Sequence, residues 1–312
     1  MSPLVSIITP CFNGERFIGR FLDSVLNQTY DNLELIIIND GSNDKTEEII
    51  DNYRSRLIDR GIKLIYEYQE NAGQAAALNR GLKLFSGDYM TWVDSDDELM
   101  PNYVSAKIKY FMTHPECAFC YGKIEFFKED LPDILVHEKI KRLNTNIKFI
   151  DCVCFDVQNI CFVGYMIKAD CLKLVLKNTD IYPGRGGQNA QLLIPLTWKY
   201  GEPDYVSESV YKSYIRNDSH SHSQDTTEKI IMQLYNYETI LVETLKRISD
   251  DKTESYINKI HQYYARWRFN CSFDSNDSVL IRKQYKELKQ KGYASQKDYV
   301  HYLKWRIKFF AR

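Results

Sequence analysis

The sequence has no large excess of charge of either sign. Its 312 residues include 41 Lys and Arg and 42 Asp and Glu, which gives a formal net charge of −1. A protein that binds nucleic acid through its phosphates needs a large basic excess, so we expect no nucleic-acid partner. The charge is unevenly distributed, because residues 279–312 carry ten basic and two acidic side chains, a net charge of +8. We therefore expect this last segment to have a different role from the rest of the chain.

Long apolar runs and paired metal-binding cysteines are also missing. The chain begins MSPLVSIITP, without a charged leader before an apolar run, and no stretch approaches the length of a membrane span. These features predict a cytoplasmic protein. Eight cysteines are scattered along the chain, and the CxxC pair Cys117 and Cys120 has no convincing second pair at zinc-binding spacing. We expect most of the thiols to be buried.

Two common phosphate-binding motifs do not occur. The sequence contains neither a GxxxxGK[ST] loop nor a GxGxxG motif after its first apolar run. A P-loop enzyme and a dinucleotide dehydrogenase are therefore disfavoured. Any diphosphate bound here would need a metal ion to offset its charge.

What the sequence does contain is a regular alternation over its first 130 residues. Short apolar runs alternate with segments whose apolar residues recur at helical spacing. Strands that are apolar at nearly every position are covered on both faces, which is typical of a parallel sheet in an α/β fold. The expected strands are Leu4–Pro10, Leu33–Asp40, Ile62–Tyr66 and Tyr89–Val93, and the expected helices are Glu15–Gln28, Thr46–Ile58 and Gly73–Phe85.

Each expected strand is followed by a short polar loop. In α/β sheets, ligands bind beyond the carboxyl ends of the strands. Any one of these loops could be an ordinary turn or helix cap, but four of them at one edge predict a pocket for a large polar ligand. The loops are residues 10–14, 40–42, 71–74 and 94–97.

The fourth loop has the most specific chemistry. In YMTWVDSDDELMP, a buried strand ends at Val93 and is followed at once by Asp94, Ser95, Asp96 and Asp97. Two carboxylates one residue apart, at the point where a strand ends, can share a divalent cation through hard oxygen ligands. The alternative is an acidic loop that caps the next helix.

Two longer stretches resemble a known family. They are VSIITPCFNGERFIGRFLDSVLNQTYDNLELIIINDGSNDKT and NAGQAAALNRGLKLFSGDYMTWVDSDDELMP. In order and spacing they resemble the amino-terminal half of family-two glycosyltransferases of the GT-A fold, over about the first 130 residues. The resemblance implies an α/β protein with a mostly parallel, Rossmann-like central sheet flanked by helices. It also implies an inverting transferase that uses a nucleotide sugar, of the kind found in bacterial surface-polysaccharide assembly.

The resemblance assigns roles to the loop residues. Pro10 and Asn13 would line the base and ribose, and Asp40 would accept a hydrogen bond from the base imide N–H, which suits uracil or thymine. Arg80, on the helix after the third strand, would reach the diphosphate. The nucleotide-sugar-binding residues implied are Pro10, Asn13, Asp40, Ser42, Asn71, Gly73, Arg80, Asp94, Ser95 and Asp96.

The resemblance also implies a metal ion. Asp94 would contact ribose or a metal-bound water, and Asp96 would coordinate Mn²⁺ or Mg²⁺ between the phosphates, where positive charge stabilises the departing diphosphate. His220 and His222 lie where such enzymes often return a loop over the nucleotide, so either could complete the metal shell or bind the diphosphate. The alternative is an exposed loop whose histidines have no such role. The implied metal ligands are Asp94, Asp96, His220 and His222.

The expected acceptor-binding half, residues 115–225, departs from the family pattern. Strands are expected at Cys117–Phe127 and Ile160–Ile167. Gln188 and Asn189 then stand where the family has Glu-Asp, and the Asp is its usual general base. A side-chain amide cannot take a proton near neutral pH.

Three explanations for these amides stay open. In the first, Asn189 orients the acceptor while Asp218 or His220 takes the proton. In the second, the acceptor carries its own base, such as a phosphate. In the third, the protein is a weak or inactive catalyst. The catalytic residues expected from the resemblance are Asp96, Asn189 and Asp218.

Residues 226–312 are expected to form a helical extension. Within Ser295–Arg312, five basic side chains fall on one helical stripe, and aromatic and aliphatic side chains lie beside it. This pattern is typical of a helix that lies on an anionic membrane. An ordinary surface helix packed on the domain or on a second subunit is the alternative. The basic stripe is formed by Lys297, His301, Lys304, Lys308 and Arg312.

The sequence thus predicts a GT-A domain at residues 1–225, with a nucleotide-binding half at 1–114, followed by the helical extension. We expect transfer of a hexose or N-acetylhexosamine from a nucleotide-diphospho sugar, a UDP-sugar, to a glycan or lipid-linked saccharide. The expected location is the cytoplasm, peripheral to the inner face of the cell membrane. The alternatives are an inactive nucleotide-sugar-binding subunit and, less favoured, a sugar-1-phosphate nucleotidylyltransferase, which would need a glycine-rich basic loop after its first strand.

Overall fold

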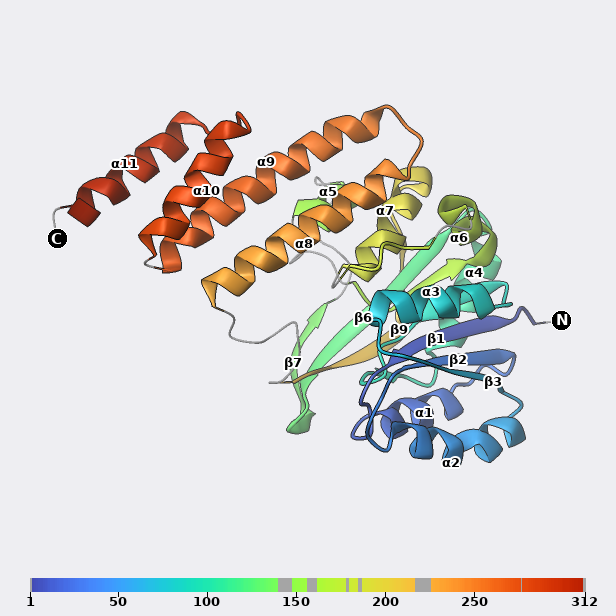
Figure 1. Cartoon of the computed structure of the whole chain (residues 1–312). Coiled ribbons are helices and arrows are strands. Elements are labelled where there is room, and N and C mark those ends of the chain that lie inside the picture. The colour runs from blue at the N-terminus through green and yellow to red at the C-terminus, as the bar shows by residue number, and fades with distance from the viewer. Residues whose placement is uncertain are drawn as a thin grey trace. The chain divides into compact units, whose positions relative to one another are not determined.

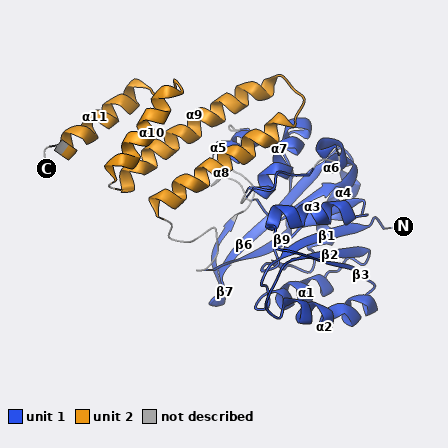
Figure 2. Ribbon diagram, in the orientation of Figure 1, with its two compact units in different colours: residues 1–222 blue, residues 223–312 orange. Residues whose placement is uncertain are grey.

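The computed structural model describes residues 2–139, 148–155, 162–177, 180–184, 187–216, 226–275 and 277–310. The chain divides into two compact units, residues 1–222 and 223–312 (Figure 2). Among the described helices, none has both the length and the apolar character needed to cross a membrane.

The first unit is built on one sheet. Its strand order is β3-β2-β1-β4-β8-β6-β9-β5, with β7 paired to β6. The neighbours β3, β2, β1 and β4 are all parallel, whereas β8 runs antiparallel to both β4 and β6. The predicted mostly parallel α/β sheet is therefore confirmed. The strands in the described residues are β1 Val5–Cys11, β2 Leu33–Asp40, β3 Lys63–Gln69, β4 Tyr89–Trp92, β5 Glu98–Leu99, β6 Phe119–Lys128, β7 Leu131–Lys139, β8 Tyr165–Lys168 and β9 Asp204–Ile215.

Helices cover both faces of this sheet (Figure 1). Buried side chains of α1, α2 and α4 form one core with alternate residues of β1 and β2, such as Ile7 and Leu35. On the opposite face, Gly81 of α3 lies so close to Ile8 that no Cβ would fit. Because both faces are covered, β2 is buried along its whole length. The described helices of this unit are α1 Ile18–Leu26, α2 Thr46–Asp59, α3 Gln74–Leu84, α4 Tyr103–Thr113, α5 Phe149–Phe155, α6 Ala169–Leu176 and α7 Gln188–Tyr200.

The expected elements of the first 130 residues are present, with bounds that shift by a few residues. The expected strand at Ile160–Ile167 is wrong in its first half, because strand β8 starts only at Tyr165. Residues 160 and 161 lie outside the described part, and Gly164 has a φ of +77°, a left-handed conformation that strands do not use. The short β5, the exposed arm β7, and helices α5 and α6 were not among the elements expected from the sequence.

The second unit consists of helices, as predicted. Its core contains Phe269 and Leu288, and it also buries a charged group, since Arg268 of α9 has no exposed surface. This arginine pairs with Glu238 of α8 and Glu287 of α10, so one side chain joins three helices. A buried charge is tolerated only when it is paired in this way. The described helices are α8 Thr227–Lys246, α9 Lys252–Ser272, α10 Ser278–Gln290 and α11 Gln296–Phe310, with a short 3-10 turn at Phe273–Ser275.

Candidate functional site

The loops after β1 and β2 are joined at the carboxyl edge of the sheet. Asn13 has a φ of +49°, a left-handed conformation that asparagine tolerates better than most residues. Its backbone N–H donates to Ser42 Oγ at 2.9 Å, and its Oδ1 accepts from the N–H of Asn43 at 2.9 Å. Because hydrogen bonds run in both directions, the two loops form one rigid rim.

Asp40, at the end of β2, fixes the loop after β3. The residue is 3% exposed. Its carboxylate accepts hydrogen bonds from the N–H groups of Ala72 and Gly73, each at 2.9 Å, and from the Gln69 side chain at 2.7 Å. Gly41 follows with a φ of +76°, and a Cβ there would lie 2.7 Å from the Asn71 nitrogen. The second and third loops are therefore in direct contact, and Gly41 permits that contact.

A chain of side-chain amides continues from this rim to the acidic loop and beyond. Gln74, directly after Gly73, donates through Nε2 to Asp94 Oδ1 at 2.8 Å. Gln188, in the first turn of α7, donates in turn to Gln74 Oε1 at 2.6 Å. The predicted donor-side residue Asp94 and the predicted acceptor-side position 188 are thus connected through a single glutamine.

The acidic loop after β4 contains three carboxylates with different surroundings. Asp97 is buried and accepts from the Tyr211 hydroxyl at 2.7 Å and from the Tyr214 N–H at 3.1 Å. Asp94 and Asp96 are partly exposed. Asp96 lies 3.3 Å from an Arg216 nitrogen. Asp97 therefore anchors the loop to β9, and Asp94 and Asp96 present their charge at the sheet edge.

Burial and the crowding of these charges raise the pKa of Asp94 and of Asp97. Desolvation and the charge of Asp96 raise the pKa of Asp94 to about 7, although the Gln74 hydrogen bond and Arg216 act in the opposite direction. Burial and the charges of Asp96 and Asp94 raise the pKa of Asp97 well above its ordinary value. Repulsion of this kind is relieved by a cation.

Two arginines supply positive charge to the loop. Arg216, at the end of β9, has its guanidinium 4.6 Å from the centroid of the Phe17 ring. Arg20 of α1 donates to the backbone oxygen of Asp96 and pairs with Glu129 at 3.0 Å. The cationic group beside the Asp96 carboxylate thus comes from β9, a strand far away in the sequence.

The residues present fit a divalent cation. No group of three or more His, Cys, Asp or Glu side chains that could hold a metal ion occurs in the described part of the chain. Mg²⁺ and Mn²⁺ are nevertheless commonly held by one or two carboxylates, with waters and substrate phosphates as the remaining ligands. Asp94 and Asp96 provide this donor set, and Arg216 already places a positive group beside Asp96.

The predicted acceptor side of the edge lies at the start of α7. Gly187 precedes the helix with a φ of +65°, and no side chain caps its first turn. The Oδ1 atom of Asn189 is buried and has no hydrogen-bond partner among the described residues. A buried carbonyl oxygen without a partner is costly, so this amide is suited to receive a donor from a ligand or water.

The segment before α7 is fixed by two side-chain amides. Asn79 of α3 exchanges hydrogen bonds with the backbone of Ile181, at 2.8 and 2.9 Å. Gln191 of α7 does the same with the backbone of Tyr182, at 2.5 and 2.8 Å. The first turn of α7 is therefore positioned against α3, the helix that carries Gln74.

The remaining predicted site residues lie as follows. Pro10 is partly exposed at the end of β1, and Ser95 lies in the acidic loop. Arg80 pairs with Glu67 of β3. Asn71 donates through Nδ2 to the backbone oxygen of Asp40 at 3.0 Å. Asp218, His220 and His222 fall outside the described residues.

The sequence prediction assigned no role to Gln74, Arg20 or Arg216. Gln74 was expected only as a loop residue, although its position directly after Gly73 placed it at the predicted edge. The signal for Arg216 was its place at the basic end of a Tyr-rich stretch, YVSESVYKSYIR at residues 205–216. Arg20 gave no such signal, because a lone arginine on an amphipathic helix is usually solvated.

The family model for glycosyl transferase family 2 matches residues 6–170. An uncharacterized glycosyltransferase of Rickettsia typhi is 46% identical over 107 residues, which are 34% of this chain and 31% of that protein. The match thus spans about a third of that relative's length.

Solved structures extend the likeness over nearly the whole chain. S. aureus TarS 1–349 is similar with a TM-score of 0.61 at 16% identity, covering 93% of this chain and 79% of that one. The same TarS fragment is known in complex with UDP-GlcNAc. The mannosyltransferase PcManGT from Pyrobaculum calidifontis, in complex with GDP-Man and Mn²⁺, has a TM-score of 0.58 at 13% identity and covers 98% and 80% of the two chains. At these identities the likeness shows the fold, and the predicted GT-A fold is confirmed.

Proposed function

The chain belongs to glycosyl transferase family 2, and from that membership we propose that it transfers a hexose or N-acetylhexosamine from a UDP-sugar, with inversion, to a glycan or lipid-linked saccharide. The observation that carries the proposal is the connection from Asp40 to Asp94. Asp40 accepts a hydrogen bond from Gly73, and the next residue, Gln74, donates to Asp94. Consecutive Cα atoms are about 3.8 Å apart, so one nucleotide could contact both carboxylates.

The base and ribose would bind along the rim formed by the first three loops. Asp40 already accepts three hydrogen bonds from the protein, and a carboxylate has about four acceptor sites. One site is left for the imide N–H of uracil. Asn13, with Pro10 beside it, would contact the ribose side of the nucleotide. The residues proposed to contact the base, the ribose or the diphosphate are Pro10, Asn13, Asp40, Ser42, Asn71, Gly73, Arg80 and Ser95.

Asp94 and Asp96 would hold Mn²⁺ or Mg²⁺ at the diphosphate. The ion, when bound, would supply positive charge to the leaving diphosphate. Arg216 lies 3.3 Å from Asp96, so its guanidinium could turn to a phosphate oxygen of a diphosphate bound there. The neighbour PcManGT was solved with Mn²⁺ and GDP-Man, which supports a divalent ion in this fold. Arg80 could leave Glu67 in the same way.

The acceptor would bind at the start of α7. We propose that Asn189 orients the acceptor hydroxyl, because its Oδ1 is buried without a partner and can accept that group's hydrogen bond. An amide cannot take the proton. The proton would pass to Asp218 or His220, or to a base on the acceptor itself, such as a phosphate. His220 and His222 would also be available to the metal ion or the diphosphate.

The donors of two neighbouring structures bear on the choice of nucleotide sugar. TarS 1–349 binds UDP-GlcNAc, which favours a UDP-sugar over a guanine nucleotide, although PcManGT binds GDP-Man. A lipid-linked acceptor would present its saccharide at the cytoplasmic face of a membrane. We propose that the protein acts there as a peripheral protein of bacterial surface-polysaccharide assembly.

A second candidate is an inactive subunit that binds a nucleotide sugar. It is favoured by one observation, the amides Gln188 and Asn189 at the positions of the family's acidic pair. Donor binding would then persist through Asp40, Asp94 and Asp96, without a group to activate the acceptor.

Incubation with Mn²⁺ and a panel of nucleotide sugars tests these candidates. Slow release of sugar from one UDP-sugar, faster with a saccharide acceptor, is the result expected of the transferase. Binding without turnover, also in the presence of acceptors, would identify the inactive subunit. Exchange of pyrophosphate into the nucleotide sugar would instead indicate a nucleotidylyltransferase and overturn both.

A further inference from the structure

The last helix, α11, is fixed to the second unit along one face only. Asp298 is buried there and accepts from the Ser295 N–H at 2.8 Å and from Arg266 of α9 at 3.2 Å. The ring of Tyr302 stacks on Tyr285 of α10 with centroids 3.9 Å apart. These contacts define which face of α11 points inward, and the opposite face is left exposed.

The exposed face is basic. Lys297, Lys304 and Lys308 are exposed and have no ion-pair partner in the described part of the chain. The two acidic side chains after residue 278, Glu287 and Asp298, are already paired with arginines of α9. Residues 279–312 have a net charge of +8. The exposed lysines of α11 therefore face solvent without an acidic side chain beside them among the residues that the structure describes.

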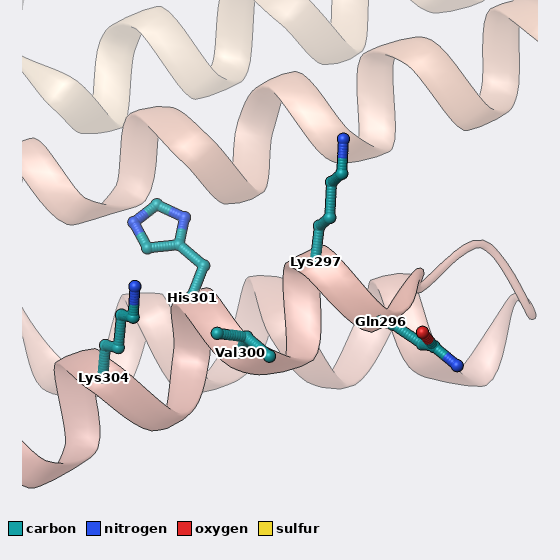
Figure 3. A pocket seen from close by; sticks show the side chains of 5 residues that line it. All are labelled: Gln296, Lys297, Val300, His301 and Lys304. Carbon is teal, nitrogen blue, oxygen red and sulfur yellow. The ribbon is translucent and has the colours of Figure 1, made fainter.

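Two of these lysines, Lys297 and Lys304, line a shallow groove of about 400 Å³ (Figure 3). Lys297, His301 and Lys304 point to the same side of α11, and Val300 lies between them. The imidazole of His301 is held by stacking on Phe273 with centroids 4.2 Å apart. The groove thus combines two ammonium groups and an imidazole with an apolar side chain, which suits a phosphate group attached to an apolar molecule.

Large apolar side chains lie on the same exposed face. Val300 is 47% exposed and Ile307 is 69% exposed. They are seven residues apart, so they share a helix face, with Lys304 between them. A nucleic acid would engage the lysines but would gain nothing from these aliphatic groups. An anionic bilayer would engage both, since its phosphates attract lysine and its acyl boundary accepts aliphatic side chains.

We propose that this face of α11 binds a bilayer of anionic phospholipid. Lys297, His301 and Lys304 bind headgroup phosphates, and Val300 and Ile307 enter the boundary between headgroups and acyl chains. The inference names the surface for the peripheral location proposed above. It does not depend on sugar transfer, because no residue of the sheet edge takes part in it.

Sedimentation of the full-length protein with vesicles tests the inference. We expect binding to vesicles with about 30% phosphatidylglycerol and much weaker binding to pure phosphatidylcholine, with the difference reduced by salt. The triple variant Lys297→Gln/Lys304→Gln/Lys308→Gln should lower the partition coefficient about 100-fold, since each basic side chain near such a surface contributes about five-fold. Ile307→Ser, which keeps the charge, should lower it about ten-fold.

The matched control is the triple variant Lys109→Gln/Lys252→Gln/Lys259→Gln, which removes the same charge from exposed positions on α4 and α9. Binding of this control should stay within about two-fold of the wild type. An equal loss in both triple variants, or equal binding to both kinds of vesicle, would overturn the inference. Tighter binding to single-stranded RNA than to vesicles, with no effect of Ile307→Ser, would assign the surface to nucleic acid instead.

A measurement of UDP-sugar hydrolysis in solution, without vesicles, distinguishes a failure of membrane binding from a failure of the proposed reaction. The lysine and isoleucine variants should hydrolyse donor at the wild-type rate and show wild-type helical circular dichroism. If no donor is turned over by any form of the protein, the proposed function fails and the vesicle result still stands.

Discussion

The proposed donor side and the proposed acceptor side of the sheet edge differ in charge and in how their polar groups are satisfied. On the donor side, Asp40 accepts three hydrogen bonds from the protein, and Asp94 and Asp96 are paired with Gln74 and Arg216. On the acceptor side, Asn189 presents an amide whose buried oxygen has no partner among the described residues. The donor side is therefore organised before a ligand arrives, whereas the acceptor side still has a polar group to satisfy.

This contrast separates two tasks. A diphosphate has concentrated charge, and a preorganised set of carboxylates with a cation stabilises its departure. An acceptor hydroxyl is neutral and needs orientation, which an amide can provide. The amides at positions 188 and 189 are thus compatible with the proposed transfer if the proton leaves through another group.

The largest effect should follow from removing Asp96, the proposed metal-binding carboxylate of the donor side. We predict that Asp96→Ala weakens Mn²⁺-dependent binding of UDP about 100-fold or more, since a lost ligand should cost at least as much as a lost outer-shell partner. Isothermal calorimetry with and without Mn²⁺ measures this. The matched control Asp51→Ala, an exposed carboxylate on α2 that pairs with Arg54, should bind as the wild type does. Unchanged affinity in Asp96→Ala would remove the metal assignment.

On the acceptor side, the expected effect is smaller and of a different kind. We predict that Asn189→Ala lowers turnover about 10- to 100-fold with the donor affinity unchanged, because misplacement of a reacting group costs up to about 100-fold. Steady-state rates with saturating donor, together with UDP binding, measure the two quantities. If donor affinity falls as much as turnover does, Asn189 takes part in donor binding, and the proposed separation of donor and acceptor sides is wrong. If neither changes, the acceptor binds elsewhere.

The two sides also differ in how far the sequence could predict them. The donor-side loops follow directly from strands whose apolar pattern is local, so Asp40, Gly41 and Asp94 could be placed at one edge from the sequence alone. The contact between Gln188 and Gln74 joins residues 114 positions apart, and no local pattern indicates it. The same holds for Arg216 and Asp96, because the position of β9 in the sheet depends on tertiary packing.

The smallest expected effect concerns the glutamines that connect the two sides. Gln74→Leu removes the hydrogen bond to Asp94 and the acceptor of Gln188 together, and Gln188→Leu removes only the second contact. The bond between the two amides contributes about 1 kcal/mol, and the bond to the carboxylate contributes at least as much. We therefore predict that Gln188→Leu lowers turnover about five-fold and Gln74→Leu about 25-fold. Because the two side chains share one interaction, the double variant should be no slower than Gln74→Leu, which is the signature of coupling in a double-mutant cycle. Effects that multiply, giving about 125-fold in the double variant, would mean that the two glutamines act independently.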